Sequence, residues 1–305
     1  MMNTKTTFKS GMVTIIGRPN VGKSTLLNAI LNTKVAIVSK IPQTTRNQIR
    51  GIFNEERGQI VFIDTPGIHY GRDNLDRFMN ESSSMTINDA DCIIYLVDLS
   101  RRIGEEERTV AEKLKDVKAP IIIGLNKIDL GQNRMPEYIE FWEQVRGMPV
   151  TEMKNITLLP MSGLNGTNIH KLIDIVFEQL PEGPAYYPAD ILTDVPQRMA
   201  MADIIREKFF LMMREELPHS IGVFIESMNK RKNVINIKTL IYVEKDSHKE
   251  IVIGKGGAIL KKVGTLARED LERLLDFKVF LELRVKTQAN WRDDLNILTE
   301  LGYRL

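Results

Sequence analysis

The stretch Gly17-Arg-Pro-Asn-Val-Gly-Lys-Ser24 decides the fold of this chain. It fits the pattern GxxxxGK[ST], and it lies between an apolar run at 12–16 and a helix-forming run at 25–31. A buried strand, a glycine-rich turn and a helix N-terminus are the context in which this pattern binds phosphate. The backbone N–H groups of the turn and the helix dipole attract anionic oxygens. We therefore expect a phosphate-binding loop here, and a chance glycine turn is the less favoured alternative.

Different side chains of this loop are expected to bind the phosphates and the metal ion of a nucleotide. Lys23 is expected to reach the outer phosphates, and the Ser24 hydroxyl is expected to ligate Mg²⁺. The other predicted nucleotide contacts in and beside the loop are Gly17, Asn20, Val21, Gly22 and Thr25.

Apolar and amphipathic runs alternate along the chain from this loop to residue 180. Such alternation predicts a mostly parallel sheet that helices cover on both faces. Ligands in these sheets bind at the carboxyl ends of the strands. The predicted strands are 12–16, 48–54, 59–64, 91–99, 120–126 and 156–160, with 48–54 and 59–64 as an antiparallel hairpin, and the predicted helices are 25–31, 75–90, 104–118, 136–145 and 167–180.

Two loops near the phosphate-binding loop have the residues expected around a terminal phosphate. Asp64-Thr-Pro-Gly67 ends a predicted strand, so Asp64 is placed to hold a water on Mg²⁺, and Gly67 lets a backbone N–H approach the phosphate. Thr44 and Thr45 lie on a polar loop, and one of them can ligate Mg²⁺ while a terminal phosphate is present. Loops ordered only by such contacts act as switches.

Two further motifs follow strands and point to the base of the nucleotide. Asn126-Lys-Ile-Asp129 offers a carboxylate, Asp129, that can accept both the ring N–H and the exocyclic amine of guanine. Adenine would leave that charge unpaired, so the site should discriminate strongly. Asn126 and Lys127 are expected to brace the loop and cover the base. The tripeptide Ser162-Gly163-Leu164 is expected to place a backbone N–H on the guanine oxygen.

In the order and spacing of these motifs the chain resembles the Era-like family of translation-factor-related GTPases. The resemblance implies a P-loop GTPase fold that binds GTP and GDP, hydrolyses GTP with Mg²⁺, and uses Thr45 as the metal-binding switch residue. Family members usually have Ala where this chain has Gly163, which leaves the backbone contact in place. Ras-like proteins orient the attacking water with a Gln at the position of Ile68, so the catalytic water-positioner is unknown here.

The role of Asn20 has two open interpretations. It matches an Asn that holds a potassium ion near the phosphates in related GTPases, so K⁺ is a candidate second cofactor. The alternative is a residue that only stabilises the turn. Turnover that needs help from an ion or a partner is the hypothesis that follows from Ile68.

The pattern changes after the breaker-rich segment Pro181-Glu-Gly-Pro-Ala-Tyr-Tyr-Pro188, which we interpret as part of a linker. We expect a GTP-binding domain at 1–182, a linker at 183–196 and a second domain at 197–305. The second domain is predicted to have a helix at 197–216, strands at 220–229, 234–243 and 278–285, two short helices to residue 275 and a short helix in the tail at 296–305.

Gly254-Lys255-Gly256-Gly257 is the motif of the second domain, and we place it between a strand and a helix. A tight GxxG loop brings backbone and a helix N-terminus close to nucleic-acid phosphates, as in KH domains that hold about four nucleotides. The order of elements matches an α+β type II KH domain. The predicted RNA-binding residues are Gly254, Lys255, Gly256, Gly257, Lys261 and Lys262.

A GTPase domain followed by a KH domain is a specific combination, and it extends the family resemblance over nearly the whole chain. The resemblance implies binding near the 3′ end of 16S ribosomal RNA and a role in assembling the small (30S) ribosomal subunit. It also implies peripheral association with the inner face of the cytoplasmic membrane. We expect a cytoplasmic monomer.

Composition agrees with an intracellular protein that has an anionic partner. The net charge of +2 conceals an excess of four positive charges from residue 197 onward. One cysteine, Cys92, excludes a disulfide framework within the chain, and no apolar run reaches the roughly 18 residues of a membrane span. Two other functions stay open at this stage: an RNA-binding module with a purely structural nucleotide site, and a GTPase that acts in RNA modification.

Overall fold

The computed structural model describes residues 7–39, 44–67, 73–131, 134–213 and 217–303. Contacts among them divide the chain into two compact units, each described here by itself. Met1–Ala36, Thr45–Tyr70 and Met79–Asp194 supply the first unit, and Ile37–Thr44, Gly71–Phe78 and Val195–Leu305 supply the second. None of the helices in the described ranges is long and apolar enough to cross a bilayer.

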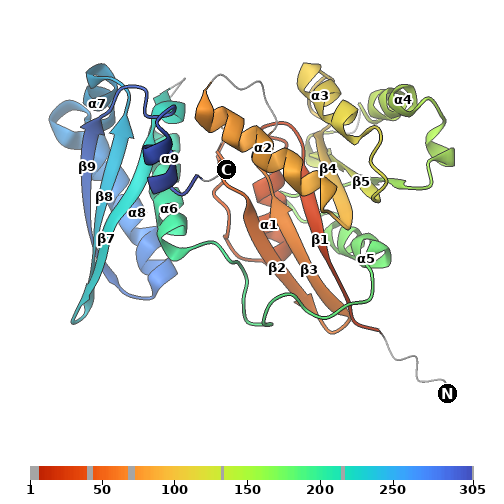
Figure 1. Ribbon diagram of the computed structural model, residues 1–305, viewed down its shortest axis with the longest axis horizontal. Coiled ribbons are helices and arrows are strands. Elements are labelled where there is room, and N and C mark those ends of the chain that lie inside the picture. The colour runs from red at the N-terminus through yellow and green to blue at the C-terminus, as the bar shows by residue number, and fades with distance from the viewer. Residues whose placement is uncertain (1–6, 40–43, 68–72, 132–133, 214–216, 304–305) are drawn as a thin grey trace. The chain divides into compact units, whose positions relative to one another are not determined.

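In the first unit, the described strands form one six-stranded sheet in the order β2-β3-β1-β4-β5-β6 (Figure 1). Its neighbours pair in parallel, except for the antiparallel hairpin of β2 and β3, as the sequence predicts. The strands are β1 (Lys9–Ile16), β2 (Ile49–Glu55), β3 (Gly58–Asp64), β4 (Cys92–Asp98), β5 (Ile121–Asn126) and β6 (Ile156–Pro160).

The central strands are buried along their whole length, which explains why they are apolar without alternation. One core cluster lies against β4 and β5 and contains Tyr95 packed edge-on to Trp142 at 5.7 Å between ring centroids. The helices of this unit are α1 (Lys23–Leu31), α2 (Asn74–Asn88), α3 (Glu105–Leu114), α4 (Met135–Arg146) and α5 (Ile169–Gln179), with the first residues of α2 assigned to the second unit.

Residues 181–194 belong to the first unit; they begin beside the start of β1, where Glu182 forms a bridge with Lys9, and end along the open side of β2. The Ile52 N–H donates to the Leu192 carbonyl at 2.9 Å, and Gly51 forms an isolated bridge with Thr193. The buried Gln59 accepts the backbone N–H groups of Tyr186 and Tyr187 at 2.7 and 2.9 Å. The contacts of Gly51 and Ile52 satisfy backbone groups that the edge strand β2 would otherwise expose, and the Gln59 bonds hold the segment in place.

The second unit contains a three-stranded sheet with its three longest helices on one face. Strands β7 and β8 are antiparallel, and β8 and β9 are parallel. The core is formed by residues that alternate along the strands, such as Ile235 and Ile237, packed against α6 and α8. The elements are α6 (Gln197–Met212), β7 (Gly222–Arg231), β8 (Val234–Val243), α7 (Asp246–Ile253), α8 (Ala258–Leu275), β9 (Lys278–Thr287) and α9 (Leu295–Glu300).

Three predicted details of this unit are wrong. The GxxG loop lies between helices α7 and α8, because the apolar run 251–253 ends a helix and is no strand. One long helix, α8, is found in place of the two short ones. The burial of Val263, Ala267 and Leu271 along one side stabilises this helix by more than Gly264 destabilises it. Helix α6 ends at Met212, because Met213 has extended backbone angles.

Segments from the first half of the sequence complete the second unit. The Arg206 guanidinium donates to the Thr44 carbonyl at 2.8 Å, and the Val38 N–H donates to Glu207 at 3.2 Å. Arg292 forms ion pairs with Asp73 and Asp76, at 2.5 and 3.0 Å. These contacts are buried or half-buried, so they persist in salt better than surface pairs.

Candidate nucleotide site and RNA groove

The phosphate-binding loop joins β1 to α1 at the carboxyl edge of the sheet. Gly22 is the N-cap of α1 with φ +104°, a conformation that a side chain would strain. The Lys23 ammonium is buried and donates to the carbonyls of Gly17 and Arg18 at 2.9 and 3.0 Å. Burial lowers the pKa of Lys23 to about 8. An anionic phosphate beside this ammonium would offset the cost of its burial.

Three oxygen-bearing side chains converge beside Lys23 from three separate segments. Ser24 Oγ donates to Asp64 Oδ2 at 2.6 Å and lies 2.8 Å from Thr45 Oγ1. Asp64 Oδ1 is buried and has no hydrogen-bond partner in the described part of the chain. Burial raises the pKa of Asp64 to about 6, against the attraction of Lys23. A hard oxygen donor set with an unsatisfied carboxylate oxygen fits Mg²⁺, so Ser24, Thr45 and Asp64 would hold that ion.

Gly67 follows this cluster and lies against the phosphate-binding loop. A Cβ at this position would meet the backbone nitrogen of Pro19 at 2.9 Å, so only glycine allows the approach. The neighbouring Ile68, and Pro42 and Gln43 of the predicted switch, lie outside the described residues.

The predicted guanine-binding loops are tied to the phosphate-binding loop by Asn126. Its amide donates to the Val21 carbonyl at 2.7 Å and accepts the Gly163 N–H at 2.9 Å. A Cβ on Gly163 would lie 3.4 Å from Leu26, an ordinary contact, so the glycine is not forced by space. Asn126 therefore joins three loops from distant parts of the sequence in one rigid frame.

Asp129 and Leu164 are exposed at the edge of this frame. One Asp129 carboxylate oxygen, Oδ1, accepts the Ser162 hydroxyl at 2.5 Å. This bond holds the carboxylate of Asp129 through one of its two oxygens. Leu164 has 79% of its surface exposed, and it offers an apolar surface and its N–H at the same edge.

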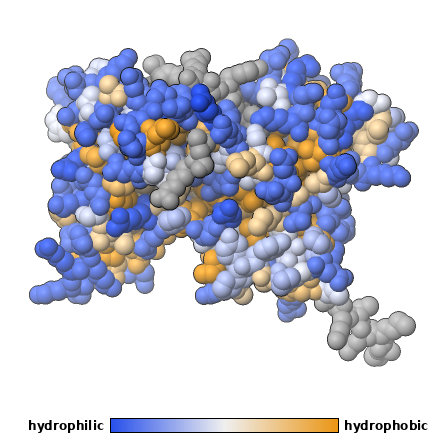
Figure 2. Space-filling view, in the orientation of Figure 1, coloured by the Kyte–Doolittle hydropathy of each residue, from blue (hydrophilic) through white to orange (hydrophobic). Residues whose placement is uncertain are grey.

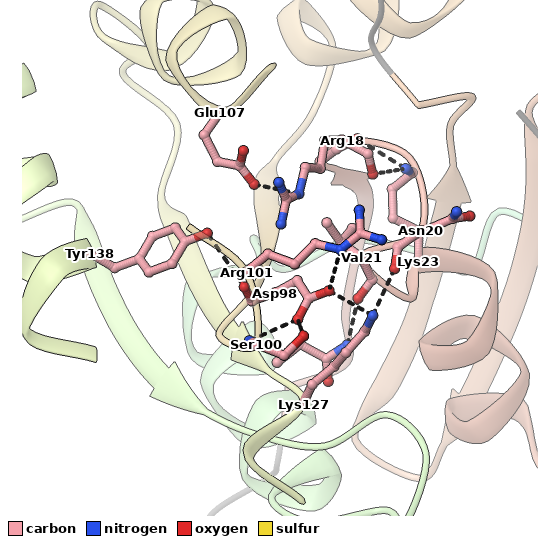
Figure 3. Close-up of polar contacts among 12 residues, drawn as sticks. Arg18, Asn20, Val21, Lys23, Asp98, Ser100, Arg101, Glu107, Lys127 and Tyr138 are labelled. Atoms are coloured by element: carbon pink, nitrogen blue, oxygen red, sulfur yellow. Dashed lines mark hydrogen bonds and ion pairs between the residues drawn. The ribbon is translucent and has the colours of Figure 1, made fainter. Parts of the chain in front are cut away.

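Asp98, at the end of β4, completes the site and was missed by the sequence reasoning (Figure 3). The Lys127 ammonium donates to Asp98 Oδ2 at 2.7 Å and to the Asn20 carbonyl at 2.9 Å. Burial opposes ionisation of Asp98, but hydrogen bonds from Lys127 and Ser100 hold its pKa below the usual value. Asp98 thus fixes the lysine that is expected to cover the base.

A buried ion pair supports the same loop from the other side (Figure 3). Arg18 Nε lies 2.6 Å from Glu107 Oε1 of α3, and both residues are more than nine-tenths buried. Burial raises the pKa of Glu107, against the attraction of Arg18. The pair ties the phosphate-binding loop to α3.

Replacing Glu107 with alanine should destabilise the protein by about 3 kcal/mol, because Arg18 would keep a buried, unpaired charge. Urea unfolding at neutral pH measures the change. Glu112→Ala on the same helix is the control, since Glu112 is exposed and its pair with Lys115 spans 3.9 Å. It should cost less than about 1 kcal/mol. Equal losses in the two variants would contradict the importance of the buried pair.

In the second unit, the GxxG loop opens into a groove of about 510 Å³ between α8 and β9. Gly254, Gly256 and Gly257 all have positive φ, and a Cβ on Gly254 would meet Ile259 at 2.8 Å. Lys261 lines the groove, whereas Lys255 and Lys262 are exposed beside it. The groove also contains residues that the sequence reasoning did not name: Leu260, Gly264, Thr265, Arg268, Phe280 and Leu283.

Comparison with known proteins identifies the family of each domain and of the whole chain. A family model described as "50S ribosome-binding GTPase" matches residues 12–127, and a "KH domain" model matches residues 216–292. The chain is 44% identical to the GTPase Era of Halothermothrix orenii and 46% identical to that of Alkaliphilus metalliredigens, over 97% of this chain and 99% of each relative. The chain belongs to the GTPase Era family.

Two solved structures of Era proteins resemble this one over 98% of the chain and 100% of their own. One is Era in complex with MgGDPNP and nucleotides 1506–1542 of 16S ribosomal RNA, with a TM-score of 0.91 and 36% identity. The other is a variant of Aquifex aeolicus Era bound to GDP.AlF4⁻, with a TM-score of 0.91 and 37% identity. The expected fold is therefore confirmed: a P-loop GTPase domain followed by a KH domain.

Membership in the Era family also confirms that the chain is a GTPase and decides against a purely structural nucleotide site. The missed residue Asp98 had a usable signal. It ends a buried strand at the same sheet edge as Asp64 and Asn126, so the rule that found them applies to it. Glu107 had no such signal, because it lies within a charged helix and finds Arg18 only in three dimensions.

Proposed function

We propose that the protein uses Mg²⁺-dependent GTP binding and hydrolysis to control its binding of ribosomal RNA near the 3′ end of 16S rRNA. The observation that carries the proposal is the convergence of the Ser24, Thr45 and Asp64 side chains. The same chain has the loops that Asn126 joins, which are predicted to bind guanine, and a GxxG groove. The Era relative with MgGDPNP and 16S nucleotides 1506–1542 supports the identity of both ligands.

In this proposal the residues of the chain position a phosphoryl group and neutralise its charge, which is most of what such transfer requires. Mg²⁺, when bound, would neutralise phosphate charge. Lys23 would move from the carbonyls of Gly17 and Arg18 to the outer phosphates. Gly67 would place its N–H near the terminal phosphate, and the backbone of the loop from Gly17 to Ser24 would surround the inner ones.

The guanine end of the site would act through fixed hydrogen bonds. Asp129 is oriented by Ser162, and Lys127 is oriented by Asp98 before any base arrives. Pre-positioned groups lose little conformational entropy on binding, so they contribute more of their interaction energy to affinity. We propose contacts to the base from Asn126, Lys127, Asp129, Ser162, Gly163 and Leu164, with Asn20, Val21 and Thr25 completing the phosphate end.

We propose K⁺ as a second activating ion, held near Asn20. Asn20 has φ +63°, an unusual backbone conformation that turns the loop, and its carbonyl is already engaged by Lys127. GTP hydrolysis should therefore be several-fold faster in KCl than in NaCl at equal ionic strength, and Asn20→Ala should remove most of the difference. Steady-state phosphate release measures both. Equal rates of the wild-type protein in the two salts would rule the ion out.

The proposed binding of ribosomal RNA in the GxxG groove is tested by measuring RNA affinity. The wild-type protein should bind a labelled RNA of 16S nucleotides 1506–1542, and Lys261→Glu should weaken binding about tenfold. A lysine that contacts phosphate should also lower the slope of log affinity against log salt by about one when it is removed. Fluorescence anisotropy over a range of KCl concentrations measures both quantities.

Lys171→Glu is the matched control, because Lys171 is an exposed lysine on α5 in the first unit. It should leave affinity within twofold. Absence of binding by the wild-type protein would overturn the RNA function, and equal losses in the two variants would mean that the groove is not the site.

We further propose that the protein assists the assembly and maturation of the small ribosomal subunit as a cytoplasmic monomer that associates peripherally with the inner face of the membrane. The family resemblance supports these roles. Among the described residues no cluster of His, Cys, Asp or Glu suits a metal-dependent modification site. Co-sedimentation with 30S particles, with and without a non-hydrolysable GTP analogue, tests the assembly role, and loss of the association in Lys261→Glu would tie it to the groove.

A further inference from the structure

The face of the β7-β8-β9 sheet opposite α6, α7 and α8 presents polar side chains in register. Strand pairing aligns Asn229 with Asn236 and Asn236 with Phe280, so these three residues form one row across the sheet. The next row contains Ser227 opposite Lys238 and Lys238 opposite Glu282. Because side chains alternate between faces, these rows lie opposite the buried Ile235 and Ile237.

One end of this face is already covered by the chain itself. Trp291 packs near Gly222, and the Tyr242 hydroxyl donates to Glu300 of α9 at 3.0 Å. The other end, toward the β7–β8 turn, remains accessible and is hollowed, with a volume of about 360 Å³. Ser227, Asn229, Arg231, Asn236, Lys238 and Phe280 line that hollow, which we call the sheet-face hollow.

Phe280 connects the sheet-face hollow to the GxxG groove. It lies on β9, one of the two edge strands of the sheet, and it lines both spaces. Its side chain is large and apolar, yet 60% of its surface is exposed. An aromatic ring in that position offers a flat surface on which a base can stack, and stacking contributes about 1–3 kcal/mol per base.

The charges around the sheet-face hollow favour an anionic occupant. Arg231 and Lys238 are exposed, and the one acidic group that lines the hollow, Glu282, lies 3.9 Å from the Lys238 ammonium. Lys232 is exposed and adds charge at the turn, where Figure 2 shows hydrophilic side chains gathered over the tip of the hairpin. Asn229 and Asn236 supply amide groups that can hydrogen-bond to base edges.

We propose that single-stranded RNA leaving the GxxG groove crosses the edge of β9 at Phe280 and continues over the sheet-face hollow. The inference rests on the proposed RNA function and extends its footprint. A KH groove holds about four nucleotides, so a longer RNA needs further protein surface to gain affinity. The exposed aromatic ring, the flanking cations and the amides are the groups that single-stranded RNA uses on sheet surfaces.

Affinity for the RNA of 16S nucleotides 1506–1542 tests the inference in the full-length protein. Arg231→Glu should weaken binding about tenfold, whereas the charge-matched Lys171→Glu should change it less than twofold. Phe280→Ala should lose about tenfold, and Phe280→Tyr should retain wild-type affinity because a stacking ring remains. Unchanged GTP hydrolysis and thermal midpoint in each variant show that the protein is still folded.

Crosslinking separates the two parts of the proposal. RNA substituted with 4-thiouridine is irradiated on the wild-type protein, and the crosslinked peptides are identified by mass spectrometry. Crosslinks both to 254–268 and to 227–238 are the expected result. Crosslinks confined to 254–268, or Arg231→Glu binding within twofold of wild type, would overturn the sheet-face path and leave the groove intact. A wild-type protein without RNA affinity would overturn the RNA function and this inference together.

Discussion

The variant Asp129→Asn should lose GTP affinity by about three powers of ten and should gain affinity for xanthosine triphosphate. In the proposed site the carboxylate would accept two donors from guanine. An amide could accept only one of them, and its NH₂ would oppose the exocyclic amine. Xanthine has a carbonyl in place of that amine, and the amide can donate to it. Competition of unlabelled GTP and xanthosine triphosphate against a fluorescent guanine nucleotide, followed by direct titration, measures both changes.

Asp174→Asn is the matched control, because Asp174 is an exposed carboxylate of the first unit that pairs with Arg57 at 2.7 Å. Its nucleotide affinities should equal those of the wild-type protein. Ser162→Ala should lie between the two variants, since it removes the hydroxyl that orients Asp129. Retention of full GTP affinity by Asp129→Asn would show that the base binds elsewhere.

The variant Lys23→Ala should lose nucleotide affinity by about three powers of ten or more and remain folded. In the proposed site the lysine would be a charge-assisted donor to the outer phosphates in a buried environment, where such bonds are strongest. Its removal should not unfold the protein, because burial already lowers its pKa to about 8 and so disfavours the charged form in the free protein. Isothermal titration with GDP in magnesium buffer and a thermal melt measure the two properties.

The control variant Lys171→Ala shows whether the loss of affinity is specific to Lys23. Lys171→Ala removes an equal charge from an exposed position and should leave affinity and melting temperature unchanged. A Lys23→Ala protein that binds GDP as tightly as the wild type would contradict the phosphate role of the loop. A protein that no longer melts cooperatively would instead show that Lys23 is needed for folding through its bonds to Gly17 and Arg18.

The part of the site that could be predicted from the sequence is the part fixed by local spacing. Lys23 and Ser24 follow from one motif, and Asp64, Asn126 and Ser162 follow from their places at strand ends in a parallel sheet. Asn126 bonds to Val21, more than 100 positions before it, and to Gly163, nearly 40 positions after it. These contacts could still be expected, because strand ends of a parallel sheet lie at one edge.

What could not be predicted depends on partners that are distant in sequence or on ambiguous short runs. Glu107 has no meaning for the site until Arg18 is seen beside it. The run 251–253 is apolar and too short to show a period, so periodicity alone does not separate a strand from the last turn of α7. Phe280 looks like an ordinary strand residue, and only its exposure on an edge strand singles it out.

The hydrogen bonds between 186–194 and the β2–β3 hairpin determine where the chain can be cut if the GTPase part is to be produced alone. A polypeptide ending at residue 182 would lose the bond between Ile52 and Leu192 and the two donors to Gln59. Its β2 would then expose unpaired N–H and C=O groups, which invite pairing with another molecule. A fragment that continues through Asp194 keeps this covering and is the better choice for soluble expression and crystallisation.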